Sequence, residues 1–119
     1  MTLNDYQDRA MSTCMASCNN FSYMSFGLVG EVGELMGKIA KHIRKENVSI
    51  DNNQLIDNDE KLTRADIELI ISELGDIQWF VAGLAQSFGY SLEEVCQHNL
   101  DKLQSRKERN KIDGDGDNR

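Results

Sequence analysis

The 119-residue chain contains no proline. Proline lacks a backbone N–H donor and breaks helices, whereas the long stretches of this chain are rich in Leu, Ile, Ala, Met, Glu and Lys, which favour helix. The sequence therefore predicts an all-α fold. We expect one domain over residues 1–112, followed by a flexible acidic and glycine-containing tail over residues 113–119. Four helices are predicted, over residues 2–18, 20–45, 63–87 and 91–109.

Helix boundaries are marked by residues whose side chains can cap a free backbone N–H. A Ser or Thr followed three residues later by an acid is typical of a capping box, and this pattern occurs at Thr2, Thr63 and Ser91. Gly89 is expected to end the third helix. The segment from about residue 46 to residue 62 is polar and dense in Asn and Asp, so a long polar loop is predicted there.

Both long helices carry an apolar stripe when projected at about 100° per residue, and both stripes are expected to form the core. In the second helix the stripe comprises Phe21, Leu28, Val32, Leu35, Ile39 and Ile43. In the third it comprises Ile67, Ile70, Ile71, Leu74, Ile77, Val81, Leu84 and Phe88.

The net charge of -7 and the isoelectric point near 4.7 argue against binding of a nucleic acid polymer, which needs clustered Lys and Arg. A phosphate-bearing substrate would then need a metal ion as intermediary. The three cysteines form no CxxC pair and are interpreted as small core residues. No apolar run is long enough to span a bilayer and the first residues lack the bases of a signal peptide, so a cytoplasmic protein without a membrane partner is expected.

Two acid-x-Gly-acid motifs provide the candidate chemistry: Glu31 with Glu34, and Glu73 with Asp76. A spacing of three residues places each pair on one side of its helix. Acids among apolar residues would repel one another unless a cation intervened, and Mg²⁺ prefers such oxygen ligands. The alternative is that these acids are solvated surface residues, which is common for a single pair. A di-iron centre is not indicated because no Glu-x-x-His is present.

Four glycines, Gly27, Gly30, Gly33 and Gly37, fall on one strip of the second helix. Each costs about 1 kcal/mol relative to alanine in a helix. Two interpretations remain open: another helix packs very closely against the strip, or the missing side chains leave room for a ligand.

Three segments, GLVGEVGELMGKI, SELGDIQWFVAGLAQSFGYSLEEV and NLDKLQSR, together resemble the MazG-like branch of the all-α NTP pyrophosphatase superfamily. The opening LNDYQDRA and the closing GDGDNR are similar to small stand-alone members, including phage-encoded ones. The resemblance implies a four-helix bundle-like fold that assembles as a homodimer or a dimer of dimers. It also implies hydrolysis of a nucleoside triphosphate to monophosphate and pyrophosphate, and hence control of nucleotide pools.

By the same resemblance, the metal-binding positions are Glu31, Glu34, Glu73 and Asp76, with Mg²⁺ as the ion and Mn²⁺ as a substitute. These four acids are also the implied catalytic residues, and Glu34 is the candidate that orients or deprotonates the attacking water. The segment between Glu34 and Glu73 is longer than in compact members, so substrate choice could differ.

Substrate-binding residues are also implied by the resemblance. Asn99 and Lys102 match an Asn-x-x-Lys motif in which the lysine meets phosphate oxygens, and Arg106, one turn later, could assist. Lys38 could do likewise or be a solvated surface residue. Trp79 could stack on a base or pack against a neighbouring helix or subunit.

Three further alternatives remain open. Tyr6 and Gln7 could reach a nucleobase or be cap and surface residues. The tail with Asp113, Asp115 and Asp117 is either disordered or folds over the nucleotide, and the resemblance favours the second; calcium binding is discounted because no bidentate Glu follows. The whole chain could instead be a non-catalytic helical module that binds a nucleotide or a partner, or a dUTP- or dCTP-specific relative.

Overall fold

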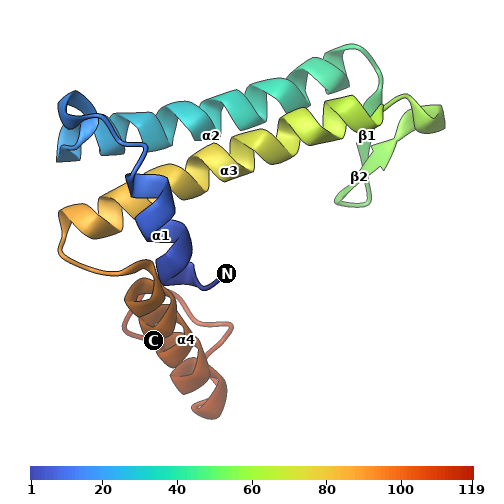
Figure 1. The fold of residues 1–119 in the computed structure, drawn as a ribbon. Helices are drawn as coiled ribbons and strands as arrows, with labels where there is room; N and C mark the ends of the chain where they lie inside the picture. The colour runs from blue at the N-terminus through green and yellow to red at the C-terminus, as the bar shows by residue number, and fades with distance from the viewer.

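The computed structural model describes residues 1–119 and confirms the all-α class (Figure 1). Its four helices are α1 (Leu3–Met11), α2 (Phe21–Arg44), α3 (Arg64–Ser87) and α4 (Leu92–Glu108). Two short 3-10 turns cover Ala16–Cys18 and Asn58–Glu60. A small antiparallel sheet pairs β1 (Val48–Asp51) with β2 (Gln54–Asp57).

The helices begin where the sequence predicts, because local side chains satisfy their first N–H groups. Capping boxes are present at Thr2, Thr63 and Ser91, and the side chain of Asn20 caps α2 by accepting from the N–H of Tyr23 at 2.8 Å. After α3, Gly89 adopts a φ of 77°, a conformation that glycine reaches without steric cost.

The first helix is shorter than the predicted range of residues 2–18. It ends at Met11, where the hydroxyls of Ser12 and Thr13 donate to the carbonyls of Arg9 and Ala10. Ser and Thr side chains compete with the helical backbone for hydrogen bonds, so two in succession end the helix.

The predicted polar loop of residues 46–62 is wrong in one respect, because it contains the β1–β2 hairpin. Asn52 and Asn53 both have positive φ angles, 50° and 62°, as a two-residue type I′ turn requires. Asn tolerates this conformation, and Val48 and Ile50 before the turn favour strand. The signal was therefore present in the sequence as two short apolar runs around Asn-Asn.

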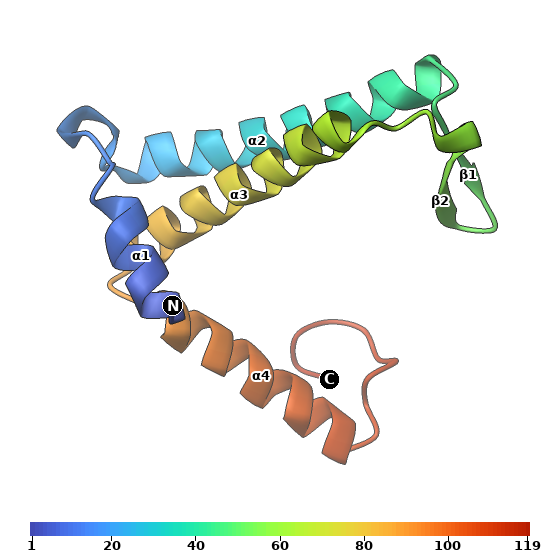
Figure 2. The same cartoon turned by 45° about the vertical axis from the view of Figure 1, so that its right-hand side comes forward.

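Helices α2 and α3 lie side by side in opposite directions, whereas α4 points away from them (Figures 1 and 2). The radius of gyration is 17.8 Å, compared with about 13.5 Å for a compact domain of this length. One chain therefore forms two arms that meet near α1.

Gln7 joins α1 to the turn between the two arms. Its buried side-chain amide donates to the carbonyls of Ala82 (3.1 Å) and Tyr90 (3.3 Å), and its Oε1 accepts from the backbone N–H of Leu92 (2.8 Å). These bonds satisfy backbone groups at the end of α3 and the start of α4. They therefore fix the direction in which α4 leaves the α2–α3 pair. The predicted surface alternative for Gln7 is wrong.

Only 12 of 119 residues are buried, and most of the predicted core stripes are not among them. In α2 the stripe buries Leu35, while Val32 and Ile43 are exposed; in α3, Ile71 and Leu74 are exposed. Each long helix has one long neighbour in this chain, so only a narrow stripe is covered. The exposed apolar side chains form the kind of surface that marks an interaction site.

The glycine strip of α2 divides into two parts. A Cβ added at Gly27 would lie 2.0 Å from Cε1 of Phe80, whereas Gly30, Gly33 and Gly37 have nothing within 4 Å of that position. Close helix packing therefore explains Gly27, and the other three lie in open space. No helix of the chain is both long enough and apolar enough to cross a membrane.

Candidate metal centre

Three of the four predicted acids converge between α2 and α3. Glu31 of α2 and Glu73 and Asp76 of α3 each offer a carboxylate oxygen, and these oxygens all lie within 4.8 Å of one another. The three-residue spacing places Glu73 and Asp76 on one side of α3, and the packing of the two helices turns Glu31 toward them. The local motif and the helix pairing together build the cluster.

The convergence leaves polar atoms without partners. Glu73 is only 6% exposed, and the Oε2 atoms of both Glu31 and Glu73 are buried with no hydrogen-bond partner. A buried, unpartnered carboxylate oxygen is costly, and a divalent cation that binds oxygen would satisfy it. The donor set is therefore chemically suited to a hard divalent cation that prefers oxygen ligands.

Lys38 supplies a positive charge to the cluster within the chain. Its Nζ lies 2.9 Å from Oε1 of Glu73, and its side chain remains 35% exposed. Lys38 follows Glu31 by seven residues, two turns along the same face of α2, which is the sequence signal for its position. Lys38 therefore combines a partly solvated side chain with an ion pair to Glu73.

The pKa values of Glu31 and Glu73 are shifted in opposite directions. The hydrogen bond from Lys38 lowers the pKa of Glu73, although burial acts in the opposite direction. Burial raises the pKa of Glu31, and its hydrogen bond with Glu73 and the charge of Glu34 add to the increase. Of these two acids, Glu73 is therefore the more readily ionised and Glu31 the more readily protonated.

Glu34 and Asp76 lie at the open side of the cluster. Both are exposed, and Glu34 is not among the three acids whose oxygens converge. Its charge nevertheless acts on Glu31, and the charge of Asp76 contributes to a raised pKa of the half-buried Tyr6, after burial itself. Tyr6 therefore lies near Asp76, a placement that the sequence alone left open.

The three predicted substrate residues of α4 lie apart from the carboxylates of the same chain. Asn99, Lys102 and Arg106 are on the arm that points away from the α2–α3 hairpin (Figure 2). Asn99 is exposed, whereas Lys102 and Arg106 contact the C-terminal tail. Within one chain, these α4 residues and the carboxylate cluster do not line one pocket.

Trp79 connects helices in this chain. Its indole Nε1 donates to the carbonyl of Ala10 and to Oγ1 of Thr13, both at 3.0 Å, and its ring lies edge-on to Phe80 with centroids 5.0 Å apart. These contacts agree with the packing interpretation and hold the end of α1 against α3.

Comparison with known proteins assigns this chain to a family. The model of the MazG nucleotide pyrophosphohydrolase domain matches residues 20–110. The chain belongs to the MazG nucleotide pyrophosphohydrolase family. It is also 42% identical over 103 residues to the Gene 37 protein of Mycobacterium phage L5, an alignment that covers 87% of this chain and 80% of that protein. No solved structure gives a significant match.

The MazG match spans α2, α3 and α4 and therefore all four predicted acids. Helix α1 and the tail after residue 110 lie outside it. The hydrogen bonds of Gln7, those from Trp79 to Ala10 and Thr13, and the tail contacts therefore join segments outside the match to the matched helices.

Proposed function

We propose that this MazG-family chain is a Mg²⁺-dependent hydrolase that converts nucleoside triphosphates to nucleoside monophosphates and pyrophosphate, and so controls nucleotide pools. The observation that supports the proposal is the convergence of Glu31, Glu73 and Asp76, with buried carboxylate oxygens that lack partners. Glu34 would complete the ligand set from the open side.

The ion, when bound, would polarise a phosphoryl oxygen, lower the pKa of a coordinated water and neutralise charge on the leaving group. The carboxylate of Glu34 could accept a proton from the attacking water, since it is exposed and lies outside the three converging acids. Lys38 could donate a hydrogen bond to a phosphate oxygen, because a lysine has three N–H donors and Glu73 occupies one direction only.

A second copy of the chain is the partner that we propose for the exposed apolar faces of α2 and α3. The extended shape and the exposure of Val32, Ile67, Ile71 and Leu74 support this, because burying them would give the hairpin a core. A homodimer or a dimer of dimers could also bring α4 of one copy toward the carboxylates of another, so that Asn99, Lys102 and Arg106 meet the phosphates.

A panel of nucleoside triphosphates and diphosphates, incubated with Mg²⁺ and resolved by chromatography, tests the reaction. Monophosphate and pyrophosphate are the expected products of a triphosphate. Orthophosphate together with a diphosphate would refute the cleavage position. Tight nucleotide binding without turnover would instead support a non-catalytic binding module, and turnover confined to dUTP or dCTP would identify a specific relative.

The metal assignment is tested by Glu73→Gln, with Glu68→Gln as the matched control on the same helix. Glu68 is exposed and pairs with Arg64, outside the cluster. We expect Glu73→Gln to lose turnover and to weaken Mn²⁺ binding, measured by electron paramagnetic resonance, while the helical circular dichroism spectrum is retained. Equal Mn²⁺ affinity in the two variants would show that Glu73 is not a ligand.

A further inference from the structure

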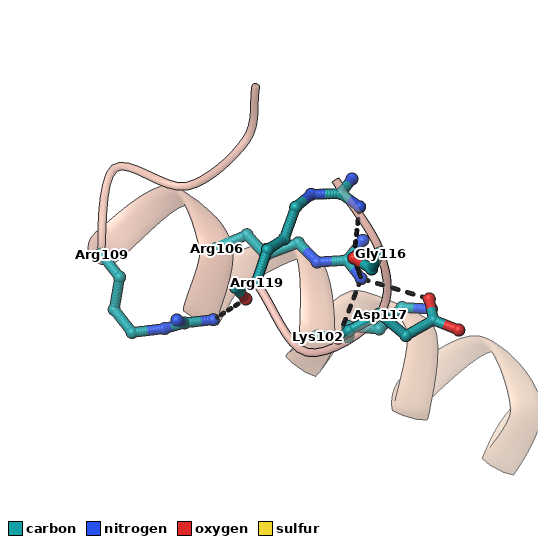
Figure 3. Close-up of polar contacts among 6 residues, drawn as sticks. All are labelled: Lys102, Arg106, Arg109, Gly116, Asp117 and Arg119. Carbon is teal, nitrogen blue, oxygen red and sulfur yellow. Dashed lines mark hydrogen bonds and ion pairs between the residues drawn. The ribbon is translucent and has the colours of Figure 1, made fainter. Parts of the chain in front are cut away.

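The C-terminal tail turns back along α4 and places a carboxylate between two cations (Figure 3). Oδ1 of Asp117 lies 3.5 Å from Nζ of Lys102 and 3.3 Å from Nη2 of Arg106. The same Arg106 nitrogen also donates to the carbonyls of Gly116 (3.5 Å) and Asp117 (3.3 Å). One acidic side chain and two carbonyls thus occupy the positive face of α4.

The tail is shaped to reach this position. After α4, the backbone N–H of Lys111 bonds to the carbonyl of Arg106 at 2.7 Å, and Gly116 adopts a φ of 75° that suits glycine. Arg109 donates to the carbonyl of Arg119, which fixes the last residue against the helix (Figure 3). The loop is therefore closed at both ends around the two cations.

Arg106 is satisfied only in part. Its side chain is 6% exposed, yet its Nε is buried without a partner, and one terminal nitrogen makes all three tail contacts. A guanidinium presents five N–H donors in a planar fork that matches phosphate oxygens. An anion with more oxygens than a single carboxylate could use the donors that Asp117 leaves free.

The Asp117 carboxylate is open to solvent. Its side chain is 87% exposed and that of Lys102 is 33% exposed, although that of Arg106 is only 6% exposed, and ion pairs between exposed groups contribute little to stability. The charge of Lys102, followed by hydrogen bonds from Lys102 and Arg106, lowers the pKa of Asp117 below its ordinary value of 3.8. Asp117 therefore carries its negative charge at neutral pH while its carboxylate stays open to solvent.

We propose that the tail is a displaceable occupant of a polyphosphate-binding site on α4, in which Asp117 holds Lys102 and Arg106 until a chain of two or more phosphates replaces it. The inference rests on the proposed function for the phosphate site on α4 and for the identity of that anion, a nucleoside triphosphate or the released pyrophosphate; the occupancy of the site by the tail is the new element. Phosphate can then bind only when the tail is released from Lys102 and Arg106. The bound tail therefore lowers the apparent affinity of the site for phosphate chains.

The test is calorimetric titration of the full chain with inorganic pyrophosphate in the presence of EDTA, which isolates α4 from the metal centre. Asp117→Asn should bind pyrophosphate about three- to tenfold more tightly than the parent chain. Asp113→Asn removes the same charge from the same tail, away from the two cations, and should bind like the parent. Equal binding by Asp117→Asn and the parent would overturn the inference, as would weaker binding, which would make the tail a part of the site.

A second measurement follows the tail itself. In ¹⁵N-labelled parent chain, pyrophosphate should move the amide signals of Gly114 and Gly116 toward their positions in Asp117→Asn. Binding without such movement would contradict displacement. If the nucleotide panel shows no hydrolysis while pyrophosphate still releases the tail, the proposed function fails alone; if hydrolysis occurs and Asp117→Asn binds pyrophosphate like the parent, the inference fails alone.

Discussion

Substituting Gly27 by alanine tests how closely α2 and α3 must approach. The added Cβ would lie 2.0 Å from Cε1 and 2.3 Å from Cζ of Phe80, whereas carbon atoms normally pack at about 3.5–4.0 Å. Phe80 cannot easily move aside, because it is 7% exposed and its ring packs against those of Tyr23 and Trp79, with centroids 5.6 and 5.0 Å away. The helices must therefore separate or the ring must leave its rotamer.

The expected magnitude is the difference between two effects. Overpacking of a filled core costs about 1–3 kcal/mol, and an overlap this severe belongs at the upper end. Alanine recovers about 1 kcal/mol of helix propensity relative to glycine. Gly27→Ala should therefore lose about 2 kcal/mol of unfolding free energy, which for a small domain lowers Tm by roughly 8 °C.

Gly30→Ala is the matched control, since a Cβ there meets nothing within 4 Å. It should unfold at the parent temperature or a few degrees above it, as followed by far-UV circular dichroism. Because Gly27 precedes Glu31 by one turn, Gly27→Ala should also weaken Mn²⁺ binding more than Gly30→Ala does. Equal unfolding temperatures for the two variants would refute the close-packing explanation of Gly27.

Three further predictions concern assembly and folding. Ile71→Lys should reduce the molar mass measured by light scattering, because it places a charge on the apolar face proposed to bind a second copy. Ile50→Lys, on the β1–β2 hairpin, should leave the mass unchanged; it is a matched control because the two residues are 57% and 59% exposed. Gln7→Ala leaves buried backbone groups without partners and should cost about 1–3 kcal/mol in chemical denaturation; an unchanged midpoint would contradict its role. The hydrogen bonds of the Thr63 cap lower the pKa of Asp66, so its stabilisation is present above its ordinary value of 3.8 and is lost as pH falls through the shifted value. The Tm difference between the parent and Asp66→Asn should accordingly vanish in acid, and a constant difference would contradict this.

The sequence by itself determined the features that depend on residues a few positions apart along the chain. The capping boxes at Thr63 and Ser91 join residues three positions apart, so their hydrogen bonds form wherever the helix begins. The spacing of three residues likewise places Glu73 and Asp76 on one side of α3. The family resemblance also rested on short motifs that can be read in the sequence alone. The hairpin at Asn52–Asn53 was also a local signal, but its composition resembled that of a loop.

The tertiary structure alone decided which distant side chains meet. Lys38 pairs with Glu73 because α2 and α3 pack in one register, and Arg106 meets Asp117 because the tail turns back on α4. Periodicity shows that Ile71 lies on an apolar stripe, but it cannot say whether this chain covers that stripe. The reason is physical. Helix propensity and capping depend on residues within one turn, whereas the burial of a side chain depends on which other helix or chain packs against it.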